Sequence, residues 1–173
     1  ITNGTTDGVK LAVNVGAMLL VFTSLIALCN YILGWVGDWT SINDLIAQGG
    51  MYTKLSFESI SGYVLSPIAW VMGVPYADCM YFGQLLGEKT ILNEFIAYPH
   101  FGDLQDQLSP KTVVMCTYVL CGFANFASIG VQVGGIGILV PKRKSLLAKL
   151  GWLALLGGTL ACMSTAIVAG MLF

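Results

Sequence analysis

The sequence has few charged residues. Aspartate, glutamate, lysine and arginine make up 10% of its 173 residues, and hydrophobic residues make up 56%. A soluble domain is about 25% charged, so this composition indicates a protein that lies in a lipid bilayer. The net charge is −1, and the sequence has no basic stripe beyond the short run at 141–145 (PKRKS). A nucleic-acid partner is therefore not expected.

Metal-binding and catalytic patterns are also lacking. The five cysteines show no CxxC spacing, and cysteine within apolar segments behaves as a small hydrophobic residue. We therefore expect neither a disulfide framework nor a metal site in this chain. The single histidine, His100, lies in a turn-like stretch (YPHFGD) and is interpreted as a loop residue. No HExxH, GxSxG or phosphate-binding loop is present, so an enzyme is not expected.

Two apolar segments occupy the first part of the chain. Residues 11–37 carry no charge, and about 20 apolar residues are enough to cross a bilayer. We therefore predict a transmembrane helix over 9–37. Residues 55–73 are interrupted by serines and by Pro67, which favours an interfacial helix. Ser56 is placed to cap that helix, with Glu58 in its first turn.

The next stretch is too short and too polar for a simple membrane span. Residues 75–90 (PYADCMYFGQLLGEKT) contain several charges and are followed by ILNEFIAYPHF and a polar run. Two half-length helices that enter and leave on one side form a re-entrant hairpin, which needs protein or a water-filled cavity around it. We predict such a hairpin over 75–105. The adjacent Glu88 and Lys89 are interpreted either as a local ion pair or as a loop feature.

A long uncharged run follows at 112–141. A straight helix of this length would reach roughly 45 Å, well beyond the hydrocarbon core of about 30 Å. The polar residues Asn125 and Ser128 also lie inside the run. A helix spanning 111–140 that is broken near Gly122–Asn125 would account for both features.

The basic residues give the orientation. Residues 141–149 hold four of the eight lysines and arginines, and the positive-inside rule places such a loop in the cytoplasm. The last transmembrane helix, 146–173, would then end outside. The sequence therefore predicts an all-α, multi-pass integral membrane protein.

Glu94 is the first candidate functional residue. A charge inside a membrane costs about 2.5–3.5 kcal/mol on insertion scales, so a functional role is the default hypothesis. Alternatively, Glu94 is a solvated carboxylate near a helix end, where the helix dipole favours it.

Asn125 and Ser128 form a second polar cluster on one helix face. Their alternative role is hydrogen bonding between helices. A carboxylate, an amide and a hydroxyl together suit a neutral ligand rich in hydroxyl groups. Phe123 or Phe126 could offer an aromatic face to a ring, although plain packing explains either residue as well.

Three segments together resemble the C-terminal half of concentrative nucleoside transporters. They are LSFESISGYVLSPIAWVMGVP, GQLLGEKTILNEFIAY and CGFANFASIG, in this order, and the resemblance extends over essentially the whole chain. It implies a sodium- or proton-driven nucleoside symporter of the plasma membrane, assembled as a trimer. Two inverted repeats would each supply a re-entrant hairpin and a broken helix, and this chain would be the second repeat.

The resemblance also implies roles for particular residues. Glu94, Asn125 and Ser128 match the positions that hold the ribose, and Phe123 matches the aromatic residue that borders the sugar. The family's base-reading residues and its main ion site belong to the N-terminal half, which is missing from this sequence. We therefore expect part of a longer protein, with no cofactor and with the coupling ion, Na⁺ or H⁺, bound mainly outside this chain.

Two other hypotheses stay open at this point. The chain could be a non-transporting membrane scaffold or accessory subunit, in which Glu94 and Asn125 are structural. It could also be a proton-conducting element that uses Glu94 as its relay. The sequence decides neither between sodium and proton coupling nor between pyrimidine and purine nucleosides.

Overall fold

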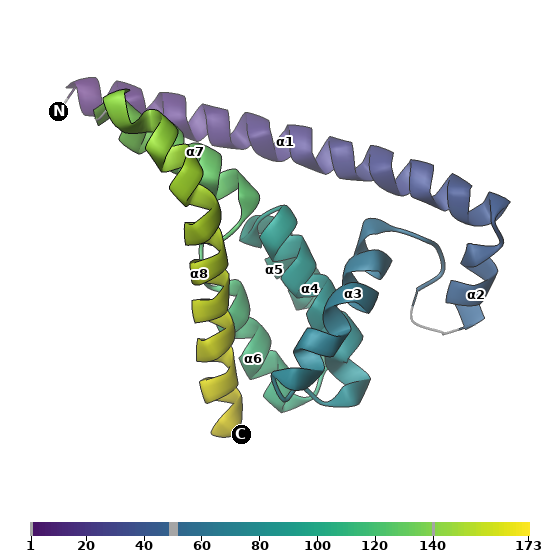
Figure 1. The fold of residues 1–173 in the computed structure, drawn as a ribbon. Coiled ribbons are helices and arrows are strands. Elements are labelled where there is room, and N and C mark those ends of the chain that lie inside the picture. Colours follow the sequence, from purple (N-terminus) through teal and green to yellow (C-terminus); the bar gives the residue numbers. More distant parts are fainter. Residues whose placement is uncertain (1, 49–51, 140) are drawn as a thin grey trace. The chain divides into compact units, whose positions relative to one another are not determined.

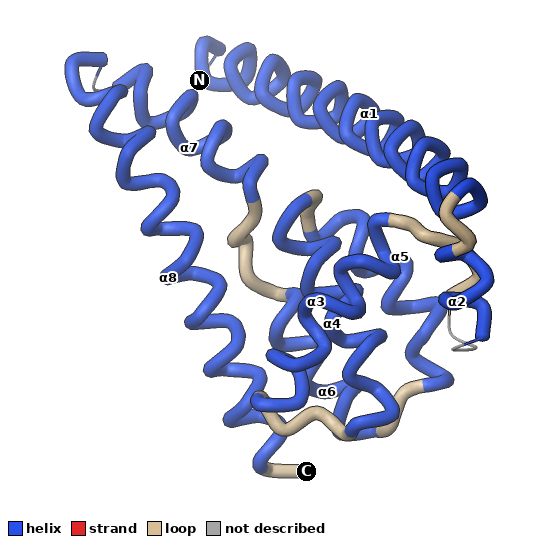
Figure 2. Tube along the Cα trace, turned by 45° about the vertical axis from the view of Figure 1, so that its right-hand side comes forward, coloured by secondary structure: helices blue, strands red, loops and turns tan. Residues whose placement is uncertain are grey.

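The computed structural model describes residues 2–48, 52–139 and 141–173, and within these residues all regular structure is helical. Figure 2 shows the helices in blue, and no described residue lies in a strand. The predicted all-α class is therefore confirmed. The main helices, labelled in Figure 1, are α1 (Thr2–Trp39), α2 (Ile42–Gln48), α3 (Phe57–Val71), α4 (Cys79–Ile91), α5 (Glu94–Leu104), α6 (Pro110–Leu120), α7 (Phe126–Leu139) and α8 (Lys144–Met171).

The chain divides into two compact units, residues 1–59 and 60–173. In the first unit, Asn30 of α1 fixes the start of α3. Its Oδ1 accepts a hydrogen bond from the Phe57 backbone N–H (2.7 Å), and its Nδ2 donates to both Glu58 carboxylate oxygens (3.0 Å each). The Asn30 side chain of α1 thus makes hydrogen bonds to the polar atoms at the start of α3.

One helix of the described part of the chain, α8, is long and apolar enough to cross a membrane. The predicted transmembrane segment 9–37 lies within α1. Several of its side chains lie outside the described part of the structure, so its membrane role stays a prediction.

Helix α3 begins as the sequence indicates. The Ser56 hydroxyl accepts a hydrogen bond from the Ser59 backbone N–H (3.1 Å), which satisfies one of the donors left free at a helix start. The predicted capping role of Ser56 is confirmed.

Small residues let α3 and α4 approach closely in the second unit. A β-carbon added at Gly83 of α4 would lie 2.9 Å from the Gly62 carbonyl oxygen and 2.9 Å from the Ser66 nitrogen of α3. One turn further on, Gly87 faces the Ser61 side chain in the same way. The two backbones are therefore nearly in contact, which only glycine permits on the α4 side.

Helices α4 and α5 form a helical hairpin whose two ends are tied by hydrogen bonds. At the turn, the Asn93 Oδ1 accepts from the Ile96 N–H (3.1 Å) and caps α5. At the open end, one oxygen of the buried Asp78 carboxylate accepts from the Ser109 N–H (3.1 Å), the Ser109 hydroxyl (2.6 Å) and the Thr112 hydroxyl (2.6 Å). Asp78 thus joins the start of the hairpin to the start of α6.

The loop prediction for His100 is wrong. Helix α5 continues through Pro99 and His100 to Leu104, because the Asn93 cap starts it and Ala97 and Phe101 are buried one turn apart. This packing overrides the local preference of proline and glycine for turns. The His100 Nδ1 lies 2.9 Å from a Glu88 carboxylate oxygen, so the residue links the two arms of the hairpin.

Helix α6 lies beside α8 (Figures 1 and 2). A β-carbon added at Gly170 of α8 would lie 2.6 Å from the Met115 sulfur of α6. The apolar core of the second unit extends from this contact to the hairpin. It consists of Ala69, Met72, Val74, Cys79, Phe82, Leu85, Leu86, Ala97, Phe101, Leu108, Met115, Cys116, Val119, Leu120 and Ala166.

The α3–α4 contact predicts different effects for two glycine substitutions. Gly83→Ala should lower the stability of the full-length protein by about 1–3 kcal/mol, because the new methyl group meets backbone atoms that cannot move independently. Gly102→Ala in α5 is the matched control, since its β-carbon would meet nothing within 4 Å. Thermal melting in detergent measures both variants. Equal melting temperatures for the two would contradict the close approach of α3 and α4.

Candidate functional site

Two residues far apart in the sequence meet at the interruption between α6 and α7. The Asn125 Nδ2 donates a hydrogen bond to the Glu94 Oε2 over 2.9 Å. Helix α6 ends at Leu120 and α7 begins at Phe126, so Asn125 lies on non-helical backbone directly before α7. Glu94 is the first residue of α5. The starts of two helices, and hence the positive ends of their dipoles, therefore meet at a carboxylate.

Asn125 and Ser128 hold each other in place. The Asn125 Oδ1 accepts from the Ser128 N–H (2.7 Å), and the Ser128 hydroxyl donates to the Asn125 carbonyl oxygen (2.7 Å). This pairing caps the start of α7 in the manner of an N-cap residue. Asn125 is 1% exposed and Ser128 is 5% exposed. Their first contribution is therefore to build a rigid helix start, and only part of their hydrogen-bonding capacity remains for a ligand.

One carboxylate oxygen of Glu94 can still accept a hydrogen bond. Its Oε2 is occupied by Asn125, whereas no residue that the structure describes donates to its Oε1. The side chain is only partly buried. The dipole-stabilised position considered from the sequence does apply, because Glu94 opens α5. The same carboxylate is nevertheless positioned by Asn125 and can accept a hydrogen bond from a ligand hydroxyl.

The two candidate phenylalanines differ. The Phe126 ring lies 6.2 Å from the Trp152 ring of α8, centroid to centroid, which is a packing role. Phe123 lies on the non-helical segment before α7 and is 55% exposed. Phe126 is 46% exposed but packs against Trp152, so the Phe123 ring is the more accessible of the two in this chain.

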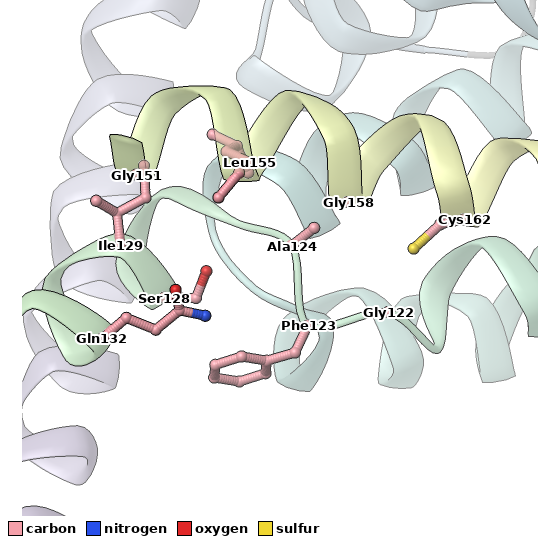
Figure 3. Close-up of a pocket in the computed structure, with 11 residues that line it drawn as sticks. Gly122, Phe123, Ala124, Ser128, Ile129, Gln132, Gly151, Leu155, Gly158 and Cys162 are labelled. Carbon is pink, nitrogen blue, oxygen red and sulfur yellow. The ribbon is translucent and has the colours of Figure 1, made fainter. Parts of the chain in front are cut away.

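A cavity of about 280 Å³ adjoins this segment. Figure 3 shows Phe123 on the segment, Ser128 and Gln132 on α7, and Gly151, Leu155, Gly158 and Cys162 on α8 around it. Phe123 and Ser128 thus line the cavity, whereas Glu94 and Asn125 do not. Its volume lies close to the lower limit for small-molecule sites, about 300 Å³.

Both sequence interpretations of Glu88 and Lys89 are wrong. The two residues lie inside α4, their side chains are fully buried, and the described residues contain no ion pair between them. The Glu88 carboxylate contacts the Gln84 Nε2 (2.8 Å) and the His100 Nδ1 (2.9 Å). Their burial was missed because the motif GEKT resembles the polar end of a helix.

The contact between Cys162 and Gly122 was also missed by sequence reasoning, which gave Gly122 only as part of the helix break. The Cys162 sulfur of α8 fills the space that a β-carbon would take at Gly122, and the Lys89 Nζ lies 4.0 Å from that position. Gly122 therefore lets α4, α8 and the segment before α7 converge. Within the described ranges, no group of three His, Cys, Asp or Glu side chains could hold a metal ion.

Comparison with known proteins gives the family. Residues 1–170 match the family described as "Na+ dependent nucleoside transporter C-terminus". The chain belongs to this family. The resemblance noted in the sequence is confirmed over almost the whole chain, and the family is one of membrane transporters.

The relatives include bacterial and animal proteins. The chain is 44% identical over 168 residues to "Uncharacterized transporter YutK" of Bacillus subtilis, covering 97% of this chain and 39% of the relative. It is 38% identical over 185 residues to "Sodium/nucleoside cotransporter 1" of Rattus norvegicus, covering 98% of this chain and 27% of the relative.

A solved structure agrees in fold. The chain is similar to "CNTnw in an inward-facing substrate-bound state", with a TM-score of 0.84 and 39% identity, over 98% of this chain and 40% of that chain. The chain therefore spans less than half the length of the relatives and the structure that it matches.

The double role of Asn125 can be separated by two substitutions. Asn125→Ala removes both the α7 cap and the bond to Glu94, and should lower stability by about 1 kcal/mol or more. Asn125→Ser keeps a good capping residue and loses only the donor to Glu94, so it should melt close to the wild type. Thermal melting of the full-length protein compares them. Equal destabilisation by both variants would contradict the capping role.

Proposed function

We propose that this chain is the C-terminal part of a cation-coupled nucleoside symporter of the plasma membrane and supplies the ribose-binding half of its substrate site. The family supports the transport of nucleosides. The observation that carries the site is the Asn125–Glu94 hydrogen bond of 2.9 Å, which joins the tip of the hairpin to the start of α7.

The chemistry of the site suits a sugar. The Glu94 Oε1 accepts a hydrogen bond from one ribose hydroxyl, and the second N–H of the Asn125 amide is available to a neighbouring hydroxyl oxygen. A hydrogen bond to a charged group contributes about 1.5–3 kcal/mol, more than a neutral one. The exposed ring of Phe123 borders the sugar face. Ser128 acts mainly by holding Asn125 in place.

The same proposal includes an arrangement of the helices in the membrane. Helices α4 and α5 enter and leave from one side as a re-entrant hairpin, and α6 and α7 together form a broken membrane helix. Non-helical backbone at membrane depth must be surrounded by protein or water, and the buried Asn125–Ser128 pairing meets this demand at the interruption. The basic residues of 141–149 put this loop in the cytoplasm and the C-terminus outside.

The remaining parts of the symporter lie outside this chain. An N-terminal half would supply the base-reading residues and the main site of the coupling ion, Na⁺ or H⁺, and the full-length protein would form a homotrimer. No cofactor is required, because transport is driven by the ion gradient.

Glu94→Gln tests the site. In the full-length protein it should reduce uridine or adenosine uptake by about 10- to 100-fold, because a charged acceptor becomes a neutral one. Asp103→Asn, an exposed carboxylate of the same hairpin, is the matched control and should transport normally.

Two outcomes would contradict the proposal. Normal nucleoside accumulation by Glu94→Gln would mean that Glu94 has only a structural role, as in a scaffold or accessory subunit. Proton flux without nucleoside that disappears in Glu94→Gln would favour a proton-conducting element instead.

Cysteine labelling tests the orientation. In a full-length protein whose own cysteines are replaced, Ser145→Cys should react with a membrane-impermeant thiol reagent only from the cytoplasmic side. Phe173→Cys should react only from outside. The reverse pattern in intact cells would overturn the orientation and, with it, the side from which the hairpin enters.

A further inference from the structure

Glu88 is a buried carboxylate on the first arm of the hairpin, with a side chain that is only 1% exposed. The Gln84 Nε2 donates to its Oε1 over 2.8 Å, and the His100 Nδ1 lies 2.9 Å from its Oε2. Among the described residues, no lysine or arginine pairs with this carboxylate. Removing an ion from water is costly unless an opposite charge compensates it. Gln84 is neutral, so His100 is the partner that can supply the compensating charge.

The His100 imidazole can take up and release a proton. Its side chain is 45% exposed, so water can reach the ring. Imidazole changes its charge between about pH 5 and 8, and a carboxylate in contact with it favours the charged form. The protonated ring makes a charge-assisted hydrogen bond, which is stronger than a neutral one. Once the proton is lost, the buried Glu88 carboxylate keeps only neutral donors.

The contact is placed to control the tip of the hairpin. Helices α4 and α5 lie side by side (Figure 1), and the Glu88–His100 contact spans 12 positions. The chain between these two residues contains the turn and Glu94, the first residue of α5. A tie between the arms on either side of the turn therefore limits how far Glu94 can move.

The other charged groups of the two arms are directed elsewhere. On α4, the Lys89 Nζ lies 4.0 Å from the β-carbon position of Gly122. On α5, Glu94 is hydrogen-bonded to Asn125, and Asp103 is exposed to solvent. The contact with His100 is therefore the charge-bearing contact that the structure gives to Glu88.

The elements around the hairpin supply no closer charge either. Asp78 at the start of α4 and Glu58 at the start of α3 are engaged in hydrogen bonds of their own. Asp106, which follows α5, is exposed. On α6, the Lys111 Nζ lies 3.9 Å from the β-carbon position of Gly73. Cysteine and tyrosine side chains lose their protons at higher pH than imidazole does. Those of the helices around the pair are Tyr63, Cys79, Tyr81, Tyr98, Cys116 and Tyr118.

We propose that the proton on His100 regulates the sugar site. The protonated imidazole ties α5 to α4 through Glu88 and holds Glu94 in position, and loss of this proton loosens the tip of the hairpin. His100 and Glu88 are positioning residues, because they act through Glu94. The inference rests on the proposed function, which assigns Glu94 to the substrate site. The tie is complete at acidic pH and is lost as the pH rises through the range in which the imidazole loses its proton.

Thermal melting of the full-length protein in detergent tests the tie without using transport. From about pH 5.5 to about pH 8.5 the melting temperature of the wild type should fall, because the folded pair binds a proton that the unfolded chain releases. Glu88→Gln removes the charge that needs compensation and should fall less steeply. His100→Arg keeps a positive charge at every pH and should also fall less steeply.

Asp106→Asn is the control, since it removes an exposed carboxylate just beyond α5, and it should keep the slope of the wild type. Parallel slopes for the wild type, Glu88→Gln and His100→Arg would overturn the proposal. If Glu88→Gln does not fold, the comparison with His100→Arg decides alone, because the half-exposed position has room for a longer side chain.

Uridine binding tests the effect on Glu94. In detergent, without an ion gradient, the Kd of the full-length wild type should rise about fivefold between acidic and alkaline pH, the difference between a charged and a neutral hydrogen bond. His100→Arg should keep the lower Kd throughout. An equal rise in the wild type and in His100→Arg would assign the pH effect to another group and overturn the proposal.

The outcomes separate this proposal from the sugar site. A uridine Kd that does not change with pH, together with lost uptake in Glu94→Gln, would overturn the regulation by His100 and support the sugar site. Normal uptake in Glu94→Gln would overturn the sugar site and the regulation of that site together, whatever the melting slopes show of the tie.

Discussion

The hydrogen bond from the Asn125 amide to the Glu94 carboxylate joins two elements that lie far apart in the sequence. Glu94 begins the second arm of the hairpin, and Asn125 ends the non-helical segment before α7. Two helix starts bring free backbone N–H groups and positive dipole ends to one place. A carboxylate at their meeting point is stabilised there, and it is held in a defined direction because the amide that contacts it is itself locked into the α7 cap.

The surrounding packing makes this meeting possible. Gly83 lets α4 approach α3, Gly170 lets α8 approach α6, and Gly122 gives room to the Cys162 thiol beside the interruption. Asp78 closes the other end of the hairpin with three hydrogen bonds. The ends of the hairpin are hydrogen-bonded and the helices pack closely where they cross. Such a framework can hold a carboxylate and an amide in a fixed relative position, as a binding site requires.

Charge is the second constraint on the site. The second unit buries Glu88 and Lys89 completely and Glu94 partly. Glu88 contacts Gln84 and His100 and so serves the packing of the two hairpin arms, whereas the Lys89 Nζ makes no hydrogen bond to any residue that the structure describes.

Sequence reasoning found the polar residues, and the family resemblance placed Glu94, Asn125 and Ser128 together at one site. Glu94, Asn125 and Ser128 stood out because polar residues in apolar segments are rare and expensive. Ser56 was correctly identified as a cap because capping depends on local spacing. The Glu94–Asn125 contact itself spans 31 positions and depends on tertiary packing. The membrane arrangement of the hairpin and of the interrupted helix, like the ribose role of the four site residues, stays a prediction.

The errors have a physical cause too. The stretch around His100 contains proline, glycine and aspartate, which favour turns, yet burial of Ala97 and Phe101 and the Asn93 cap keep it helical. Glu88 and Lys89 were interpreted as a local ion pair or a loop feature because charged residues are rarely buried completely. Only the three-dimensional structure shows that both are buried in α4 and that Glu88 is paired with His100 across the hairpin.

The most direct test of the central claim is an experimental structure of the full-length protein with uridine bound. Ribose hydroxyl oxygens should lie within about 2.6–3.2 Å of the Glu94 carboxylate and the Asn125 amide, with the Phe123 ring beside the sugar. A nucleoside bound elsewhere, with the Asn125–Glu94 hydrogen bond unchanged and no ligand atom near it, would contradict the account.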